Sequence, residues 1–437
     1  MLSHLVSRCM IARPSRLRHW AGALLSLLIA LTGAACVDAT APGPGILRVV
    51  EVSPPEPPAA GTVPEGGQGW QSVSVGRDHA CALDVAGVAW CWGSNAFSQV
   101  GTESDAKVCG PPATLCVRTP ARVETELRFQ SVTAGGTHSC GVAADGRAYC
   151  WGTNRRGQLG TTSPQIAREP VAVIGERRWI WLAAGLDHTC GIAEGGGLYC
   201  WGANERGQIG NQTFVAQSSP VRIRPQTVFM EVAASGERTC ALSVDGEIFC
   251  WGVIWLASIN ATDWSTTMTV PTRVRSDVPM RGVSVGALHA CGIEPSGAGG
   301  CWGSGLFGQR GDGGVDGSTF PRTVRGGLTF HTITAGSIQT CGVAADRRAW
   351  CWGNNSFGQL GTTVGDECLG TSCTTFPVPV AVGMRWIDVQ TGPGNHVCGI
   401  TTLTNLYCWG LGSLGQLGVD VERVTARRVP SLVRPRG

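Results

Sequence analysis

The sequence predicts an all-β fold, a seven-bladed β-propeller with one hairpin disulfide in each blade. A motif of Cys, nine residues and Cys-Trp-Gly occurs seven times, at spacings of 59, 50, 50, 51, 50 and 57 residues. Short apolar runs separated by Gly and Pro fill each repeat and lack helical periodicity, which indicates three to four strands per repeat. Seven such repeats bury their faces on one another when they close into a ring.

The first segment, residues 1–36, is predicted to be an export signal. Four Arg and no acidic residue accompany an apolar run from about Trp20 to Leu31, and small residues then lead to Cys36. This run is too short to span a membrane. Cys36 resembles the acylated cysteine of bacterial lipoproteins, and ordinary secretion with cleavage nearby is the alternative. Either route predicts an exported chain, as a cell-envelope lipoprotein or a secreted protein.

The second segment, residues 37–69, is rich in Pro, Gly and Ala. Such a composition does not bury a core and suits an extended tether between an anchor and a folded domain. The seven repeats follow at 70–434, and we expect them to form the whole globular part.

Each repeat is predicted to contain a β-hairpin that brings its two cysteines together. In the second copy, Ala144-Asp145-Gly146 forms a three-residue turn whose last residue needs a positive φ, which Gly adopts freely. Cys140 then faces Cys150 across the hairpin, within bridging distance. Arg347 and Thr404 replace the Gly in the last two copies. The predicted pairs are Cys81 with Cys91, Cys140 with Cys150, Cys190 with Cys200, Cys240 with Cys250, Cys291 with Cys301, Cys341 with Cys351, and Cys398 with Cys408.

Two longer loops carry further cysteine pairs. Loop 102–119 contains Cys109 and Cys116, and loop 362–376 contains Cys368 and Cys373. An even, repeated set of cysteines in an exported chain indicates disulfides, whereas the spacings do not fit zinc ligands. Both insertions follow the same point of their repeat, so we expect them on one face of the ring. Their disulfides either support partner recognition or protect exposed loops from proteolysis.

The repeats resemble those of the regulator of chromosome condensation family. The resemblance rests on Val-x-x-Gly-x-x-His, Asp-Gly, Trp-Gly-x-Asn and Gly-Gln-Leu-Gly, and it covers about five-sixths of the chain. It implies a seven-bladed propeller. The namesake is a nuclear guanine-nucleotide exchange factor, but the export signal and the cysteine pairs are those of exported, disulfide-rich bacterial members. The fold by itself does not assign a function.

Repeated histidines and tryptophans are interpreted as structural. Five His precede the first hairpin cysteine by two residues, and we expect each to form a repeated backbone hydrogen bond rather than a metal site. The Trp of each Cys-Trp-Gly is expected to pack between blades. No catalytic triad, carboxylate pair or phosphate-binding loop stands out, so no catalytic residue, cofactor or metal is predicted.

Partner-binding residues are predicted where the repeats differ. The residue five positions after each repeat Trp is variable and often aromatic, apolar or Arg, as expected for a protein-binding rim. The fourth copy also loses its Gly-Gln-Leu-Gly turn. The predicted residues are Phe97, Arg156, Arg206, Trp255, Leu256, Phe307, Phe357 and Leu414.

We therefore expect a non-enzymatic protein-binding scaffold that acts on an extracytoplasmic protein. The alternative is an extracytoplasmic enzyme, a glycan hydrolase or lyase with its site at the propeller mouth. The net charge of +3 falls to −1 without the four Arg of the signal. Such a chain has no basic field for nucleic acid, and it contacts a membrane only through its N-terminal lipid or signal. A monomer is expected.

Ring closure is predicted to use the C-terminal strand. Six Pro-x-x-Val strands link the seven hairpins, and the stretch before Gly76 has no equivalent. The seventh copy stands at the end of the chain, in 430–433. We expect 429–433 to pair into the first blade, with the strands around Val73 and Ala82, because an open seam would expose strand edges.

Overall fold

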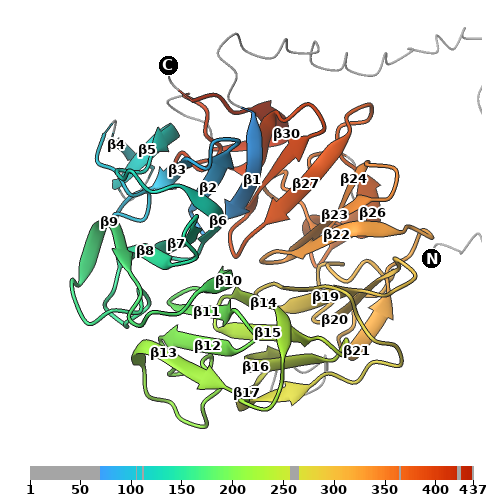
Figure 1. Cartoon of the computed structure of the whole chain (residues 1–437). Coiled ribbons are helices and arrows are strands. Elements are labelled where there is room, and N and C mark those ends of the chain that lie inside the picture. The colour runs from blue at the N-terminus through green and yellow to red at the C-terminus, as the bar shows by residue number, and fades with distance from the viewer. Residues whose placement is uncertain are drawn as a thin grey trace, which may run out of the picture. The chain divides into compact units, whose positions relative to one another are not determined.

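The computed structural model describes residues 69–104, 106–110, 113–255, 265–363, 366–420 and 425–435. These residues form seven antiparallel sheets arranged as blades around a central axis (Figure 1). The predicted signal 1–36 with Cys36, and the tether up to residue 68, lie outside the described residues. Within the described ranges, no helix is long and apolar enough to cross a membrane.

Blades one to seven follow the order of the chain, and each begins with its innermost strand and ends at its outer edge. Blades one to three contain β1 Trp70–Val75, β2 His79–Asp84, β3 Ala89–Ser94, β5 Thr114–Arg122 and β4 Lys107–Cys109; β6 Phe129–Ala134, β7 His138–Ala143, β8 Ala148–Thr153 and β9 Ile166–Ala172; and β10 Trp179–Ala184, β11 His188–Ala193, β12 Leu198–Gly202 and β13 Gln217–Ile223. Blades four and five contain β14 Phe229–Ser235, β15 Arg238–Ser243, β16 Ile248–Trp255 and β17 Ser265–Arg273; and β18 Val283–Val285, β19 His289–Ile293, β20 Gly299–Gly303 and β21 Ser318–Thr323. Blades six and seven contain β22 Phe330–Ala335, β23 Gln339–Ala344, β24 Ala349–Asn354, β26 Thr371–Pro379 and β25 Asp366–Cys368; and β27 Trp386–Thr391, β28 His396–Thr401, β29 Leu406–Leu411 and β30 Ala426–Leu432.

The second and third strands of every blade form the predicted cysteine hairpin. Cys140 lies directly opposite Cys150, and the turn ends at Gly146 with a φ of 81°. The same turn forms in the last two blades, where Arg347 and Thr404 take φ values of 66° and 60°. The hairpin register thus persists where the sequence lacks the favoured Gly.

Nine disulfides join the predicted pairs. The seven hairpin bridges have Cα–Cα distances of 4.0 to 4.1 Å. Cys109–Cys116 and Cys368–Cys373 close the additional hairpins β4–β5 and β25–β26, which add a fifth strand to blades one and six. Disulfides in this number are typical of proteins from an oxidising compartment.

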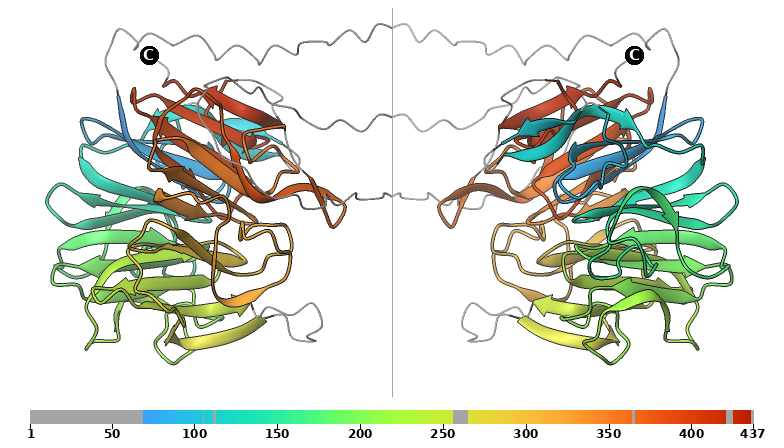
Figure 2. Two further views of the ribbon diagram at one scale, coloured as in Figure 1. Left: turned by 90° about the vertical axis from the view of Figure 1, so that its right-hand side faces the viewer. Right: turned by 90° about the vertical axis from the view of Figure 1, so that its left-hand side faces the viewer.

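The ring has two distinct faces. The hairpin face carries the cysteine-hairpin turns, such as Asp145-Gly146, together with the start of each innermost strand. The turn face carries the Gly-Gln-Leu-Gly turns, such as 157–160, which follow the third strand. Hairpins β4–β5 and β25–β26 follow these turns and lie on the turn face, as predicted. Figure 2 shows β25–β26 (orange) and the start of β17 (yellow) extending to the same side.

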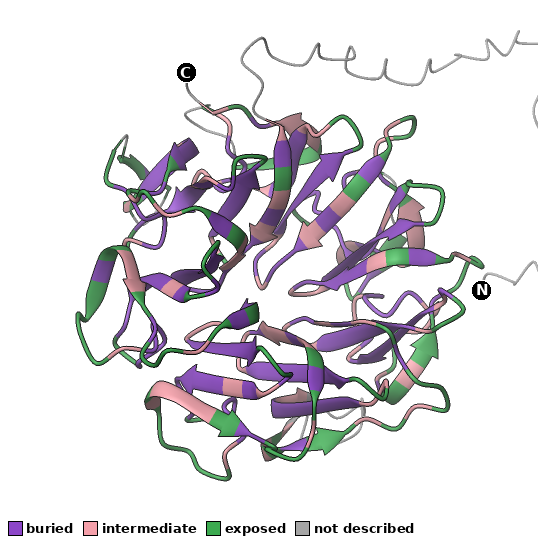
Figure 3. Ribbon diagram, in the orientation of Figure 1, coloured by how far each residue is buried: buried purple, intermediate pink, exposed green. Residues whose placement is uncertain are grey.

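The hydrophobic core is divided into seven clusters, one at each interface between neighbouring blades. The cluster between blades three and four includes Ile192, Phe229 and Trp251, which are almost completely buried. Figure 3 shows buried residues along the inner strands and exposed ones at turns and outer edges. Because each sheet is covered only by its neighbours, blade-to-blade packing determines whether the ring holds together.

The predicted ring closure is wrong. Strand β30 pairs only with β29, where Ser431 lies opposite Cys408, and it completes blade seven. Each Pro-x-x-Val strand pairs with the cysteine hairpin that precedes it in the chain and belongs to the same blade. Every blade therefore has its own Pro-x-x-Val strand. Blades seven and one are joined by side-chain packing and by hydrogen bonds instead. The Trp92 indole N–H donates to Gln416 O at 3.0 Å, and Trp70 N donates to Thr404 O at 3.0 Å.

Candidate functional site

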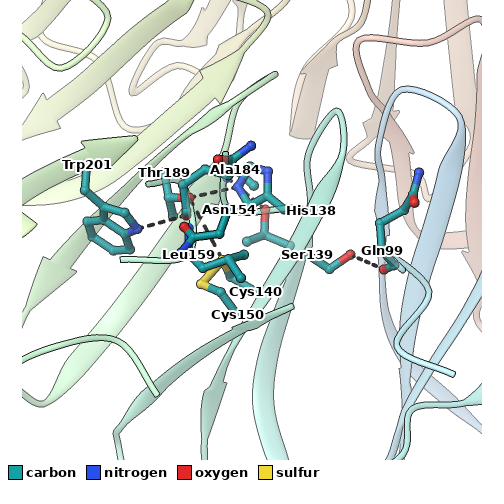
Figure 4. The surroundings of a disulfide bond; sticks show 12 residues. Gln99, His138, Ser139, Cys140, Cys150, Asn154, Leu159, Ala184, Thr189 and Trp201 are labelled. Carbon is teal, nitrogen blue, oxygen red and sulfur yellow. Dashed lines mark hydrogen bonds between the residues drawn. A yellow bond between two sulfur atoms is a disulfide. The ribbon is translucent and has the colours of Figure 1, made fainter. Parts of the chain in front are cut away.

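Neighbouring blades are joined by a repeated set of buried hydrogen bonds, which we call the interlock. Between blades two and three, the carbonyl oxygen of the turn residue Gln158 accepts bonds from the Trp201 indole (3.0 Å) and the Thr189 hydroxyl (2.8 Å). The Thr189 hydroxyl also lies 2.8 Å from His138 Nε2. Figure 4 shows this cluster beside the Cys140–Cys150 disulfide. One carbonyl, one indole, one hydroxyl and one imidazole therefore connect two blades.

The interlock recurs in full between blades three and four and between blades five and six. Gln208 O accepts hydrogen bonds from the Trp251 indole and the Thr239 hydroxyl, and Gln309 O accepts them from the Trp352 indole and the Thr340 hydroxyl. At three other interfaces it is partial. Trp151 lacks its partner between blades one and two, Val397 replaces the hydroxyl residue between six and seven, and Ala80 does so between seven and one. The repeat tryptophans thus pack between blades, as predicted.

Four of the five repeated histidines bond the next blade's hydroxyl side chain, not the predicted backbone group, and both ring nitrogens of the fifth, His396, lack a partner among the described residues. His79, His138, His188 and His289 face Ser139, Thr189, Thr239 and Thr340, respectively. Burial lowers the pKa of each of these four imidazoles to about 3, so they are neutral near pH 7. No group of His, Cys, Asp and Glu suited to a metal ion occurs among the described residues. Sequence reasoning missed the hydroxyl partners, although a Ser or Thr follows most of the slot residues.

Among the described residues, the interface between blades four and five keeps only the indole of the interlock, that of Trp302. Arg238 occupies the histidine position, Ala290 the hydroxyl position, and β16 continues to Trp255, at least two residues beyond the end of the third strand in the other blades. Arg238 Nε donates to Val253 O at 2.7 Å. The described residues provide no carbonyl partner for the Trp302 indole N–H, and residue 258, which stands at the position of Gln158 and Gln208, lies outside them.

The predicted rim residues divide into a charged group and an apolar group. Arg156 pairs with Glu205, and Arg206 pairs with Glu237 at 3.7 Å, so both cations already bridge neighbouring blades. Phe97 lies half-buried beneath the Arg155 guanidinium.

The apolar group lies farther round the ring. Phe357 is 39% exposed, and Phe307 and Leu414 are half-buried. The side chain of Trp255 and all of Leu256 lie outside the described residues. The structure therefore does not bring the six predicted residues whose side chains it describes into one continuous site.

The two cysteine hairpins add exposed apolar side chains to the same part of the turn face. Val108 and Leu115 of β4–β5 are 60% and 51% exposed, and Leu369 at the tip of β25–β26 is 71% exposed. The β4–β5 hairpin leans toward blade seven, because a Cβ placed on Gly110 would lie 3.1 Å from Leu414 Cδ2. Lys107 Nζ also lies 3.7 Å from Asp420. Blades six and one thus each present a disulfide-closed hairpin with exposed apolar side chains on the turn face. Hairpin β4–β5 lies against blade seven, whereas β26 lies against the turn of blade five, where Thr375 O accepts from Gly313 N at 3.1 Å.

The central channel contains a cavity of about 490 Å³ lined by the innermost strands. Burial raises the pKa of Glu231 in blade four to about 7 and also raises the pKa of Asp388 in blade seven. Glu231 accepts a bond from Val283 N at 3.1 Å, and Asp388 accepts one from the Gln390 amide at 2.8 Å. These carboxyl groups are engaged by neighbouring groups, and they belong to blades that are not adjacent.

Family models recognise several of these repeats. The regulator of chromosome condensation (RCC1) repeat matches residues 86–142, 145–192 and 346–400, and a second model of that repeat matches 70–99, 129–158, 182–208 and 330–359. The chain therefore contains RCC1 repeats. The matched stretches contain the cysteine hairpins of blades one, two, three and six.

Solved structures and curated proteins agree with this RCC1 repeat assignment. Human WBSCR16 superposes with a TM-score of 0.67 at 21% identity, over 77% of this chain and 88% of that one. Prp20p from Saccharomyces cerevisiae gives 0.63 at 22% identity, over 74% and 80%. The human probable E3 ubiquitin-protein ligase HERC4 is 35% identical over 88 residues, which are 20% of this chain and 8% of that protein. The structural likeness shows the fold, and the short match carries over no activity.

Proposed function

We propose that this RCC1-repeat propeller is an exported, non-enzymatic scaffold that binds another extracytoplasmic protein through one sector of its turn face. The sector, here called the stapled sector, consists of the turns of blades six and seven with hairpins β4–β5 and β25–β26. The observation that carries the proposal is the pair of disulfide-closed hairpins flanking blade seven with exposed Val108, Leu115 and Leu369. A disulfide reduces the entropy that a loop loses on binding, and exposed apolar groups suit a protein partner.

Two further observations support protein binding. Prp20p from Saccharomyces cerevisiae has binding properties to Gsp1p and histones, and a second structure has Kap60 bound to yeast RCC1 (Prp20), so propellers of this fold bind proteins. In this chain, the Arg side chains of blades two and three are occupied by salt bridges to the next blade. A new partner is therefore expected on the stapled sector instead.

Export is part of the proposal, with a lipid on Cys36 behind the signal 1–36, and with simple secretion as the alternative. The basic, apolar and small-residue segments of the sequence support it, as does the number of disulfides. Mass spectrometry of the mature N-terminal peptide distinguishes the two routes. An acylated Cys36 supports lipidation, and an unmodified N-terminus at another residue supports secretion.

The binding surface is tested by site-specific photocrosslinking in cells that express the full chain. A photoreactive residue at position 369 should capture a protein partner, whereas the same residue at position 214 should not. Phe214 is a suitable control because it is 57% exposed and belongs to the turn-face loop of blade three. Substitution of Leu115 and Leu369 by Asp should abolish the crosslink from position 357. Capture from position 214, with none from 357 or 369, would contradict the proposal.

A further inference from the structure

One repeated position of the innermost strands lines the central cavity in all seven blades. It is the third residue of six of these strands, just after a bulge, and in blade five it is the residue before β18. This position lies near the end of the channel that opens on the hairpin face. Six of its members are Gly or polar, and one is Trp. The residues are Ser72, Ser131, Trp181, Glu231, Gly282, Thr332 and Asp388.

Trp181 is an immobilised aromatic ring in the wall of this cavity. Its indole N–H donates to Val232 O of the next blade at 2.8 Å, which fixes the ring across the contact between blades three and four. The residue is nevertheless 43% exposed, whereas repeat tryptophans such as Trp201 and Trp251 are completely buried. With its N–H engaged, Trp181 offers a ligand only ring carbons and its electron-rich faces.

Glu231 provides a carboxylate beside this ring. It directly precedes Val232, whose carbonyl oxygen accepts from the Trp181 indole, and both side chains line the cavity. Glu231 Oε2 accepts from Val283 N at 3.1 Å, whereas Oε1 has no hydrogen bond or ion pair among the described residues. Burial raises the pKa of Glu231 to about 7, and the bond from Val283 N offsets only part of this effect.

The other titratable side chains that line the cavity are Arg281, His331 and Asp388. The Arg281 guanidinium is held elsewhere, because Nε donates to Glu294 O and Nη2 to Phe330 O. Asp388 lies in blade seven, where burial raises its pKa and its Oδ1 has no hydrogen-bond partner among the described residues. No basic group lowers the pKa of Glu231 or of Asp388. The cavity wall therefore favours a ligand that carries positive charge.

We propose that the central cavity binds an organic cation, an alkylammonium group that lies against the ring of Trp181 and pairs with Glu231. A carboxylate attracts such a cation by charge and hydrogen bonding, and an indole face attracts it through its quadrupole. The cavity of about 490 Å³ falls within the roughly 300–1,000 Å³ of small-ligand sites. The group is carried either by a free amine or by a Lys side chain of a bound protein. This site is separate from the stapled sector and does not depend on that sector binding a partner.

Calorimetric titration of the full chain with butylammonium in an amine-free buffer tests the site. Butylammonium should bind saturably, and neutral n-butanol should not. The matched variants are Glu231→Gln, whose amide oxygen can still accept from Val283 N, and Asp388→Asn in the wall of blade seven. We expect Glu231→Gln to weaken binding about tenfold or more and Asp388→Asn about twofold or less. Trp181→Leu should weaken it about tenfold. An unchanged melting temperature shows that each variant is folded.

The pH dependence separates charge pairing from a structural role of Glu231. Because the pKa of Glu231 is about 7, its carboxyl is mostly ionised at pH 8 and mostly protonated at pH 6, so the affinity should fall about tenfold between them. Glu231→Gln should remove most of this fall. His331→Gln, which removes the imidazole from the cavity wall, should retain it.

A capped Gly-Lys-Gly peptide distinguishes the two sources of the ammonium group. Tighter binding of butylammonium than of the peptide indicates a free amine, and binding of the peptide at least as tightly indicates a Lys side chain. The proposal is overturned if neither probe binds the natural chain or if n-butanol binds as tightly as butylammonium. It is also overturned if Glu231→Gln binds as tightly as the natural chain, or if Asp388→Asn loses as much affinity as Glu231→Gln.

Discussion

The interface between blades three and four differs from the interface between blades four and five in its buried hydrogen bonds. Each interface lies between two disulfide-containing sheets and contains a hydrophobic cluster. Only the first has the interlock of His188, Gln208, Thr239 and Trp251. The ring therefore closes without a complete set of buried hydrogen bonds. The interface between blades four and five keeps its apolar cluster and the disulfides of its two sheets.

Reduction of the disulfides should cause the largest loss of thermal stability, and it should weaken both interfaces alike. Each hairpin bridge closes a loop of about eleven residues and contributes roughly 2–3 kcal/mol in the chain-entropy model. Because every blade has one, we expect the melting temperature to fall by tens of degrees under a strong reductant. Calorimetry with and without the reductant measures the change. A fall of only a few degrees would show that the bridges add little.

Acid should destabilise the interfaces that contain His. A buried imidazole with a pKa of about 3 stays neutral, whereas the unfolded chain is protonated below about pH 6.5. The histidines therefore contribute fully above pH 6.5, and stability is lost as the pH falls toward 3, by about 2 kcal/mol per His at pH 5. Glu231, whose pKa is raised to about 7, opposes part of this loss between pH 7 and 4.5.

Urea unfolding at pH 7 and pH 5 measures this loss, and His138→Gln is its matched control. Gln339 already occupies the same position in blade six and donates to Gly394 O at 3.1 Å. The variant should therefore fold, and its stability should decline less between pH 7 and pH 5 than that of the natural chain. An identical decline would mean that His138 is not buried in neutral form.

Substitution of Gly185 should weaken the contact between blades three and four. A Cβ at position 185 would lie 2.1 Å from His188 Cε1, so Gly185→Ser must displace the imidazole from Thr239. We expect a loss of about 2–4 kcal/mol in unfolding free energy. In blade four, the equivalent residue is already Ser235, beside Arg238. Ser235→Gly should change stability by no more than about 1 kcal/mol in the same urea titration. Equal costs at the two positions would contradict this explanation.

Removal of one hydroxyl should have a smaller effect. Thr239→Val leaves His188 Nε2 without a partner, at a cost of about 1–3 kcal/mol. Adding His188→Gln gives this interface the residues found between blades six and seven, where Gln339 stands at the histidine position and Val397 at the hydroxyl position. Part of the stability should therefore return. Thermal and urea unfolding of the single and double variants measure both steps. A double variant less stable than Thr239→Val would indicate that the pairs are not interchangeable.

Much of the fold could be predicted because it repeats. The register that places Cys140 opposite Cys150 follows from a local turn, and seven copies indicate a closed ring. The closure was mispredicted because the phase of a repeat is ambiguous in sequence. The Pro-x-x-Val strand could equally end one blade or begin the next, and only the pairing of β30 with β29 decides.

The candidate sites were harder to predict, because they depend on contacts between repeats. Arg156 and Arg206 looked available in sequence, but Glu205 and Glu237 of the next blades hold them. The hydroxyl of Thr189 gains its role only where it meets His138 and Gln158 of another blade. Arg238 and Ala290 are conspicuous only after the interlock has been seen at the other interfaces.

Native-state hydrogen exchange compares the two interfaces most directly. If the missing interlock makes blades four and five easier to separate, peptides from β14–β17 and β18–β21 should exchange at least about tenfold faster than peptides from β10–β13, a factor that corresponds to roughly 1.4 kcal/mol. Equal protection of all three blades would contradict the view that the interlock strengthens the contact between neighbouring blades.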